Sequence, residues 1–257
     1  MRRPGWMLAG AVVLSLLPVT VSGCSVTCGC TATADPNWTP QPITAQQAAF
    51  YAAKVAGRAS GTIDDPSMSA VPISGPNGRD FYQATAADFV ALVDSTSGSV
   101  VEVVLEDQLP NDAIVSASAS DARTAAEAFM QRAGNLEGLS ESAQVVRRAG
   151  VAAYEVQWNP AEKDATTFVV WVNPSSGSVF AFIDLRMQLN LTAPIVGRER
   201  ATALAITALG VPGETVTSAE LAIDFTTGSQ SSVWQVGFVS RTVRVDAVTG
   251  ETTVVKS

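Results

Sequence analysis

One short turn pattern occurs three times in this chain of 257 residues, each time near the end of a similar stretch. Each occurrence has a valine, then Asp or Asn, then three further residues and a glycine. The pattern occupies residues 93–98, 172–177 and 245–250. An alanine-rich segment that ends in Gly57, Gly134 or Gly210 precedes each occurrence. The chain is therefore predicted to repeat one unit, a helix followed by a β-hairpin, three times.

The spacing within the three stretches supports this repetition. An alanine stands nine residues before each helix-ending glycine, and the turn's Asp or Asn follows that alanine by 46, 48 or 45 residues. The three alanines are Ala48, Ala125 and Ala201. A period near 75 residues is longer than the units of about 20–50 residues in ordinary solenoids. The sequence leaves open whether the three units form one array or separate domains.

The expected fold class is α+β, with three repeated units of one helix packed on a small antiparallel β-sheet. Unit 1 is expected at 44–109, unit 2 at 116–189 and unit 3 at 195–257. Alanine spacing and capping signals predict helices at 45–56, 122–133 and 198–209. Residues 57–80 are expected to be irregular because they are rich in Gly, Pro and Asp. Strands are expected at 81–84, 89–93, 99–105, 154–158, 168–172, 178–185, 219–224, 233–239, 242–245 and 251–255.

The repeated turn has a structural interpretation. An Asp or Asn side chain accepts a hydrogen bond from a backbone N–H two residues on, and glycine adopts positive φ without a steric penalty. The predicted turn residues are Asp94, Gly98, Asn173, Gly177, Asp246 and Gly250. A calcium or catalytic role for these acids is the alternative. Unit 2 has Asn in place of Asp, and no second acidic ligand stands nearby, so we expect turn chemistry and no metal site.

The first 23 residues are predicted to be a secretion signal. Arg2 and Arg3 precede an apolar run at 7–17 that is too short to span a bilayer comfortably. Residues 21–24, Val-Ser-Gly-Cys, resemble the bacterial lipobox, whose cysteine receives a diacylglyceryl group. Cys24 would then anchor the protein to a membrane through its acyl chains. An ordinary secretory signal is the alternative interpretation.

Residues 24–43 are expected to form the lipidated cysteine and a flexible tether, rich in Thr, Ala and Pro. Cys28 and Cys30 lie within it. They would bind a soft metal such as Cu(I), form a strained local disulfide, or have no role beside the anchor. We expect the last, because two thiolates without a third ligand make an incomplete site.

Charge and composition exclude several classes of function. The net charge is −8, and removal of residues 1–23 with their two arginines makes it −10. Such an acidic chain is unsuited to nucleic acid, whose phosphates require Lys and Arg. The chain has no histidine, so it cannot build a Ser-His-Asp triad, a Cys-His pair or a histidine-ligated zinc site. No catalytic residue and no cofactor are predicted.

Two predicted strands are apolar on both faces. They are residues 89–93, Phe-Val-Ala-Leu-Val, and 168–172, Phe-Val-Val-Trp-Val. Strands of this kind need cover on both sides. We expect a neighbouring unit or a helix to supply it, and an exposed apolar patch for a partner or lipid-like ligand is the alternative.

Unit 3 resembles a known family. An alanine-rich helix, then Trp-Gln-Val-Gly-Phe at 234–238, then Val-Arg-Val-Asp-Ala-Val-Thr-Gly-Glu at 243–251, is similar to the PepSY domain. Unit 1 keeps Val93, Asp94 and Gly98, whereas unit 2 departs with Asn173 and Pro174. That domain occurs in the propeptides of thermolysin-type secreted metalloproteases and in many bacterial envelope proteins. The resemblance implies one helix on a small antiparallel sheet and a non-catalytic role in regulating peptidases.

The sequence therefore predicts a non-enzymatic, extracytoplasmic lipoprotein, anchored to the cell membrane, that acts by binding. Its partner would be a secreted peptidase or another envelope protein, which it would regulate or inhibit. Sheet edges or exposed aromatic side chains would make the contact, with Phe81, Tyr82, Trp158, Trp171 and Trp234 as candidates. We nevertheless expect each of these five to lie in the core, because large aromatic side chains are usually mostly buried. The alternative is a lipoprotein that carries a small apolar ligand between its sheets.

Overall fold

The computed structural model describes residues 42–58, 63, 67–75, 78–148, 150–160, 166–187, 192–210, 214–224 and 231–256. The predicted signal peptide, Cys24, Cys28, Cys30 and the tether up to residue 41 lie outside this part of the chain. Residues Pro40–Ser257 form one compact body. No helix among the described residues has both the length and the apolar character needed to cross a bilayer.

The described residues fold into three α-helices, each followed by four strands, which confirms a mixed α+β fold with antiparallel sheets. The elements of unit 1 are α1 (Ala45–Ala56), β1 (Ser69–Ser74), β2 (Asp80–Thr85), β3 (Phe89–Asp94), β4 (Val100–Leu105) and the 3₁₀ turn η2 (Glu106–Gln108). Those of unit 2 are α2 (Ala119–Ala133), β5 (Leu139–Arg148), β6 (Val151–Pro160), β7 (Phe168–Val172), β8 (Val179–Asp184) and η3 (Leu185–Met187). Those of unit 3 are α3 (Arg198–Leu209), β9 (Val216–Asp224), β10 (Ser231–Phe238), β11 (Arg241–Asp246) and β12 (Thr252–Lys256).

Local sequence sets the ends of the helices. Thr44 accepts from the backbone N–H of Gln47, and the Gln47 side chain accepts from the backbone of Thr44, so a capping box starts α1. Gly57 ends it at φ 74°, a value that glycine adopts without strain. Helix α2 starts at Ala119, earlier than the predicted residue 122, because Ser118 and Asp121 form a second capping box.

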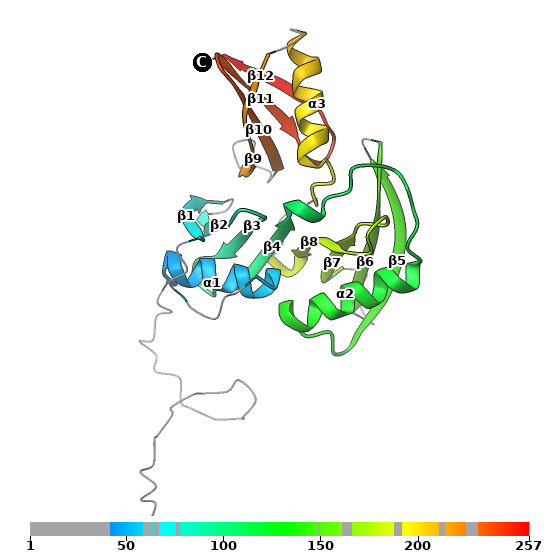
Figure 1. Cartoon of the computed structure of the whole chain (residues 1–257). Helices are drawn as coiled ribbons and strands as arrows, with labels where there is room; N and C mark the ends of the chain where they lie inside the picture. The colour runs from blue at the N-terminus through cyan, green and yellow to red at the C-terminus, as the bar shows by residue number, and fades with distance from the viewer. Residues whose placement is uncertain are drawn as a thin grey trace, which may run out of the picture. The chain divides into compact units, whose positions relative to one another are not determined.

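Units 1 and 2 share one sheet, whereas unit 3 has its own (Figure 1). The large sheet has eight strands in the order β1-β2-β3-β4-β8-β7-β6-β5, and the small sheet has the order β12-β11-β10-β9. The last strands of units 1 and 2 join the large sheet, because β4 pairs antiparallel with β8. Helices α1 and α2 lie on the same face of it (Figure 1).

The central hairpins have the same register in all three units. An aromatic residue pairs with the valine that precedes the turn's Asp or Asn in each case. These pairs are Tyr82 with Val93, Tyr154 with Val172, and Trp234 with Val245. In unit 2 the connection between the two strands spans residues 161–167, longer than 86–88 in unit 1, which accounts for the wider spacing in the sequence.

Two strands were not expected. Strand β1 lies within residues 57–80, which were predicted to be irregular, and β5 was not predicted. Pro72 in β1 and the many polar residues of β5 hide the usual strand pattern. Tertiary pairing overrides these weak local preferences, because β1 pairs with β2 over six residues and β5 with β6 over ten.

Both faces of the large sheet are covered by packed side chains. Phe89, Ala91 and Val93 of β3 pack in the cluster that contains the buried residues of α1 and α2. Val90 and Leu92 pack in a second cluster, which includes residues of the unit 3 sheet. The apolar faces of β3 and of β7 are therefore used in packing between elements.

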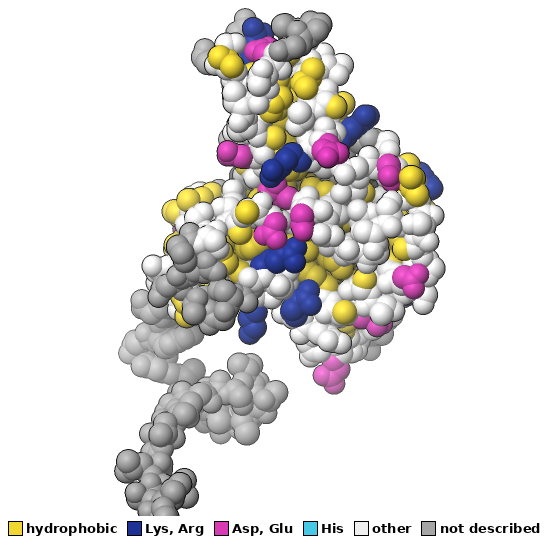
Figure 2. All heavy atoms as spheres, in the orientation of Figure 1, with side chains coloured by type: hydrophobic (Ala, Val, Ile, Leu, Met, Phe, Trp, Pro, Cys, Tyr) yellow, Lys and Arg dark blue, Asp and Glu magenta, His cyan; other side chains and the backbone are white. Residues whose placement is uncertain are grey.

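Unit 3 also makes polar contacts with unit 1. The backbone N–H of Ile223 in β9 donates to Gln83 in β2 (3.2 Å), and Arg198 at the start of α3 pairs with Glu106 of η2 (2.6 Å). Next to this pair, Arg58 pairs with Asp88 (2.6 Å). Figure 2 shows side chains of both charge signs close together in the middle of the face it displays.

Candidate functional site

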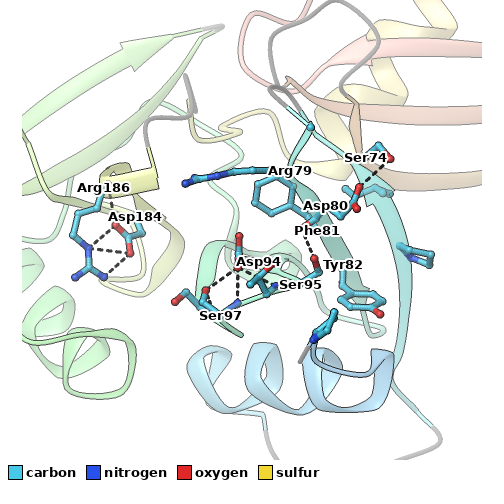
Figure 3. Close-up of a pocket in the computed structure, with 16 residues that line it drawn as sticks. Ser74, Arg79, Asp80, Phe81, Tyr82, Asp94, Ser95, Ser97, Asp184 and Arg186 are labelled. Atoms are coloured by element: carbon cyan, nitrogen blue, oxygen red, sulfur yellow. Dashed lines mark hydrogen bonds and ion pairs between the residues drawn. The ribbon is translucent and has the colours of Figure 1, made fainter. Parts of the chain in front are cut away.

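A hollow of about 1120 Å³ lies at one end of the large sheet. The start of β2, the end of β1, the β3–β4 turn and the end of β8 meet there (Figure 3). Its charged lining residues are Arg79, Asp80, Asp94, Asp184 and Arg186. Most of this lining comes from unit 1, and the pairing of β4 with β8 adds Asp184 and Arg186 of unit 2 to it.

Asp94 holds the β3–β4 turn at the base of the hollow. One carboxylate oxygen accepts from the backbone N–H groups of Thr96 (3.1 Å) and Ser97 (2.6 Å) and from the Ser97 hydroxyl (2.8 Å). Gly98 then has φ 72°. A Cβ at Gly98 would also lie 2.9 Å from the Tyr51 ring, so backbone conformation and space both require glycine.

Asp184 and Arg186 form a tight ion pair at the end of β8. The guanidinium donates from Nε (2.9 Å) and Nη2 (2.6 Å) to the two carboxylate oxygens of the buried Asp184. It also lies 4.5 Å from the centre of the Phe168 ring. The hydrogen bond with Asp184 raises the pKa of Arg186, although burial opposes this shift. The pair is a fixed, bidentate contact.

Arg79 and Asp80 supply charge from the β1–β2 side. Arg79 extends across the hollow toward Asp184 and Arg186 (Figure 3). Asp80 accepts from the Ser74 hydroxyl (3.2 Å), and its backbone carbonyl accepts from the Ser95 hydroxyl (2.7 Å). The hollow therefore presents charges of both signs and several hydroxyl groups on a fixed frame.

The other two predicted turns have the same local geometry outside the hollow. Asp246 accepts from the backbone N–H groups of Val248 (2.8 Å) and Thr249 (2.7 Å). Asn173 accepts from Ser175 (2.9 Å) and also donates to the backbone carbonyl of Gln108 (3.0 Å). Gly177 and Gly250 have φ 73° and 79°. The turn residues thus lie apart, one in each unit, and form no common site.

The aromatic candidates belong mainly to the core. Phe81, Trp158, Trp171 and Trp234 are buried, and Tyr82 is half-buried at the edge of the hollow. Burial in the core, the placement expected for these side chains, is therefore confirmed for four of the five, which leaves Tyr82 as the one aromatic candidate for a surface contact. Burial of large apolar rings in a packed sheet outweighs their use on the surface.

Sequence reasoning missed the charged residues of the hollow other than Asp94. Asp184 and Arg186 belong to unit 2, whereas Arg79 and Asp80 belong to unit 1, about a hundred residues earlier in the chain. Only the pairing of β4 with β8 brings them together. No group of His, Cys, Asp and Glu side chains suited to a metal occurs among the described residues.

Comparisons with known proteins leave the family open. No family model matches the sequence, and no curated protein matches it. Among solved structures, the chain is similar to the Bacillus megaterium YpeB C-terminal domain, with 13% sequence identity and a TM-score of 0.41. That similarity covers 84% of this chain and 100% of the other. A likeness this distant supports no argument about activity, so function is inferred from the residues of this chain.

Proposed function

We propose that this chain is an extracytoplasmic binding protein, held to a bacterial membrane by a lipid on Cys24, with no catalysis of its own. Its partner would be a polypeptide, either a secreted peptidase or another envelope protein, which it regulates or inhibits. The observation that carries the proposal is the hollow of about 1120 Å³ between units 1 and 2, where a segment of the partner would lie.

The charged groups of the hollow suit recognition better than catalysis. Asp184 is occupied by Arg186, and the Asp94 oxygen that contacts Ser97 also accepts two backbone N–H groups. The Ser97–Asp94 contact therefore belongs to the turn and is not a nucleophile paired with a base. Arginine N–H groups beside hydroxyl groups suit the carboxylates and backbone carbonyl groups of a polypeptide, which accept hydrogen bonds from such donors.

We also infer that units 1, 2 and 3 are copies of one PepSY-like unit. The shared order of helix and four strands supports this, as does the common register of the three central hairpins. The peptidase-regulating role of that family is the reason to test peptidases first as partners.

Lipid anchoring has a direct test. We expect Cys24→Ala to abolish acylation and to move the protein from the detergent phase to the aqueous phase, because the acyl chains supply the membrane affinity. The measurement is phase partitioning of parent and variant from whole cells. Partitioning of the variant with membranes, as in the parent, would reject the lipobox interpretation.

The hollow is tested by reversing the charge of Arg79, which is exposed and projects into it. We expect the full chain, purified in detergent, to lower peptidase activity in the secreted fraction of the native cell. Arg79→Glu should weaken this effect about tenfold, which corresponds to about 1.4 kcal/mol. Arg241→Glu is the matched control, because Arg241 is exposed on β11, away from the hollow.

Each outcome of this assay has a defined meaning. Loss of inhibition by Arg79→Glu alone supports binding of a peptidase in the hollow. Equal inhibition by the parent and both variants would place the binding surface elsewhere. No inhibition by the parent would reject a peptidase as the target and leave another envelope protein as the partner class, to be sought by cross-linking from position 79.

A further inference from the structure

Strand β12 forms one edge of the small sheet and presents apolar side chains to solvent. Val254 and Val255 are 41% and 40% exposed. In the described part of the chain, β12 is hydrogen-bonded to β11 and to no other strand. The backbone N–H and C=O groups along its outer side are therefore open to pairing with a further strand.

The corresponding strands of units 1 and 2 are paired with each other. In each unit, the third residue before the turn's Asp or Asn pairs with one residue of the unit's last strand. This residue is Val103 in β4, Phe182 in β8 and Val254 in β12. Val103 pairs directly with Phe182, and both are fully buried. Corresponding positions thus face each other across a local two-fold axis in the β4–β8 junction.

Helix α3 has the same kind of exposed position. Ile206, four residues before Gly210, is 37% exposed. The corresponding residues of α1 and α2 are Ala53 and Met130, and both have an exposure of 0%. Helices α1 and α2 meet at the junction, where Arg132 donates to the backbone carbonyl of Val55 (3.4 Å). Unit 3 therefore exposes, on strand and helix, positions that are buried in units 1 and 2.

The other edge strands carry features that discourage pairing. Strand β1 has Pro72, β5 has Glu141 and Arg147, and β9 has Glu220. Proline and charged side chains are common protection for sheet edges. Residues 252–255 of β12 are Thr-Thr-Val-Val, which are all β-branched and favourable for strand pairing, and the one charged residue of the strand, Lys256, stands at its end.

We propose that β12 pairs antiparallel with β12 of a second copy of this chain, and that this pairing makes a homodimer. Between two chains, this contact repeats the junction that β4 and β8 form within one chain. Val254 lies on the two-fold axis opposite Val254 of the other copy, and Val255 lies opposite Thr253. The dimer buries both valines and joins the two small sheets into one of eight strands.

A second copy is the occupant that the geometry favours. In the β4–β8 junction, corresponding positions pair with each other, which is the arrangement of an isologous two-fold interface. Two copies of β12 satisfy this arrangement, because Val254 then pairs with itself and the uncharged Thr253 and Val255 pair with each other. Helix α3 of each copy would meet its counterpart beside the strands, as α1 meets α2.

The test uses the full chain in detergent and light scattering that separates protein mass from detergent mass. We expect the parent to have twice the mass of one chain over a concentration series. Val254→Lys should give a single chain, since two like charges would face each other on the axis and repel. Val71→Lys is the matched control, because Val71 is 52% exposed on the β1 edge, and this variant should remain dimeric.

Restoring the dimer with a complementary pair of variants distinguishes loss of a two-fold contact from loss of folding. Val254→Asp alone should also give a single chain, but an equal mixture with Val254→Lys should restore the dimer mass, because Asp then faces Lys. A parent that is monomeric throughout would overturn the proposal. Retention of the dimer by Val254→Lys would also overturn the proposal. An equal mixture of the Lys and Asp variants that stays monomeric would overturn it too, since that result is expected of an edge that binds an unrelated peptide.

Discussion

Asn173 stands where the other units have Asp94 and Asp246, and it makes a hydrogen bond that a carboxylate cannot make. All three side chains accept a backbone N–H two residues on. Only an amide can also donate, and that of Asn173 donates to the Gln108 carbonyl of η2 (3.0 Å). The difference between Asn and Asp at this position therefore reflects the contact between units 2 and 1.

Replacement of this amide is expected to weaken the fold. Asn173→Asp would place a buried carboxylate against the carbonyl of Gln108 and remove the donor. We expect a loss of about 1–3 kcal/mol in the free energy of unfolding, the usual cost of leaving a buried polar group unsatisfied. The midpoint of urea unfolding measures it.

The reverse change in unit 3 is the control for this prediction. Asp246→Asn keeps the turn's acceptor for Val248 and Thr249, so the unfolding midpoint should change little. Equal losses of unfolding free energy in Asn173→Asp and Asp246→Asn would show that the contact with Gln108 does not distinguish the two positions. A rise in the parent's melting temperature with Ca²⁺ that is absent in Asp246→Asn would indicate a metal role for the turn.

At the scale of elements, helices and buried strands could be predicted, but polar edge strands could not. The bounds of α1 follow from the Thr44–Gln47 capping box and Gly57, and the end of α3 follows from Gly210, because those signals lie next to the helix in the sequence. Strand β7 was predicted at its observed bounds from an uninterrupted apolar run. Strand β5 is a strand because β6 pairs along its whole length, and such a partner leaves no local signal.

The candidate site could be predicted only in part, for the same reason. The Asp94 turn follows from the order Asp-Ser-Thr-Ser-Gly, since each group it uses lies within four residues. Arg79 and the ion pair of Asp184 with Arg186 come to line the same hollow only when β4 and β8 pair. That pairing is a contact between residues about 80 apart, which periodicity does not reveal.

For the whole molecule, attachment of unit 3 to unit 1 involves a partly buried ion pair. Glu106 of η2 accepts from Arg198 of α3 (2.6 Å), and the guanidinium also lies 5.7 Å from the centre of the Trp234 ring. Burial raises the pKa of Glu106 above its ordinary value of 4.5, although the hydrogen bond and charge of Arg198 lower it. The folded protein thus holds this proton more tightly than the unfolded chain does.

The sign of the pH dependence follows from that shift. A carboxyl group with a raised pKa contributes most to stability below 4.5, and the contribution is lost as the pH rises through the raised pKa. Arg198→Met keeps an apolar stem near Trp234 but removes the group that lowers the pKa of Glu106. The pKa should therefore rise further, and the ionised carboxylate at neutral pH would lack its partner.

We expect Arg198→Met to lower the free energy of unfolding at neutral pH by about 1–2 kcal/mol, less than for a fully buried pair because Arg198 is half exposed. The deficit should shrink as the pH falls and Glu106 takes up a proton. Urea unfolding of parent and variant across this pH range measures it. In a Glu106→Gln background, Arg198→Met should lower the free energy of unfolding by less at neutral pH, and this loss should vary little with pH. A deficit that is constant with pH in both backgrounds would show that Arg198 stabilises the attachment of unit 3 through packing on Trp234 and not through its charge.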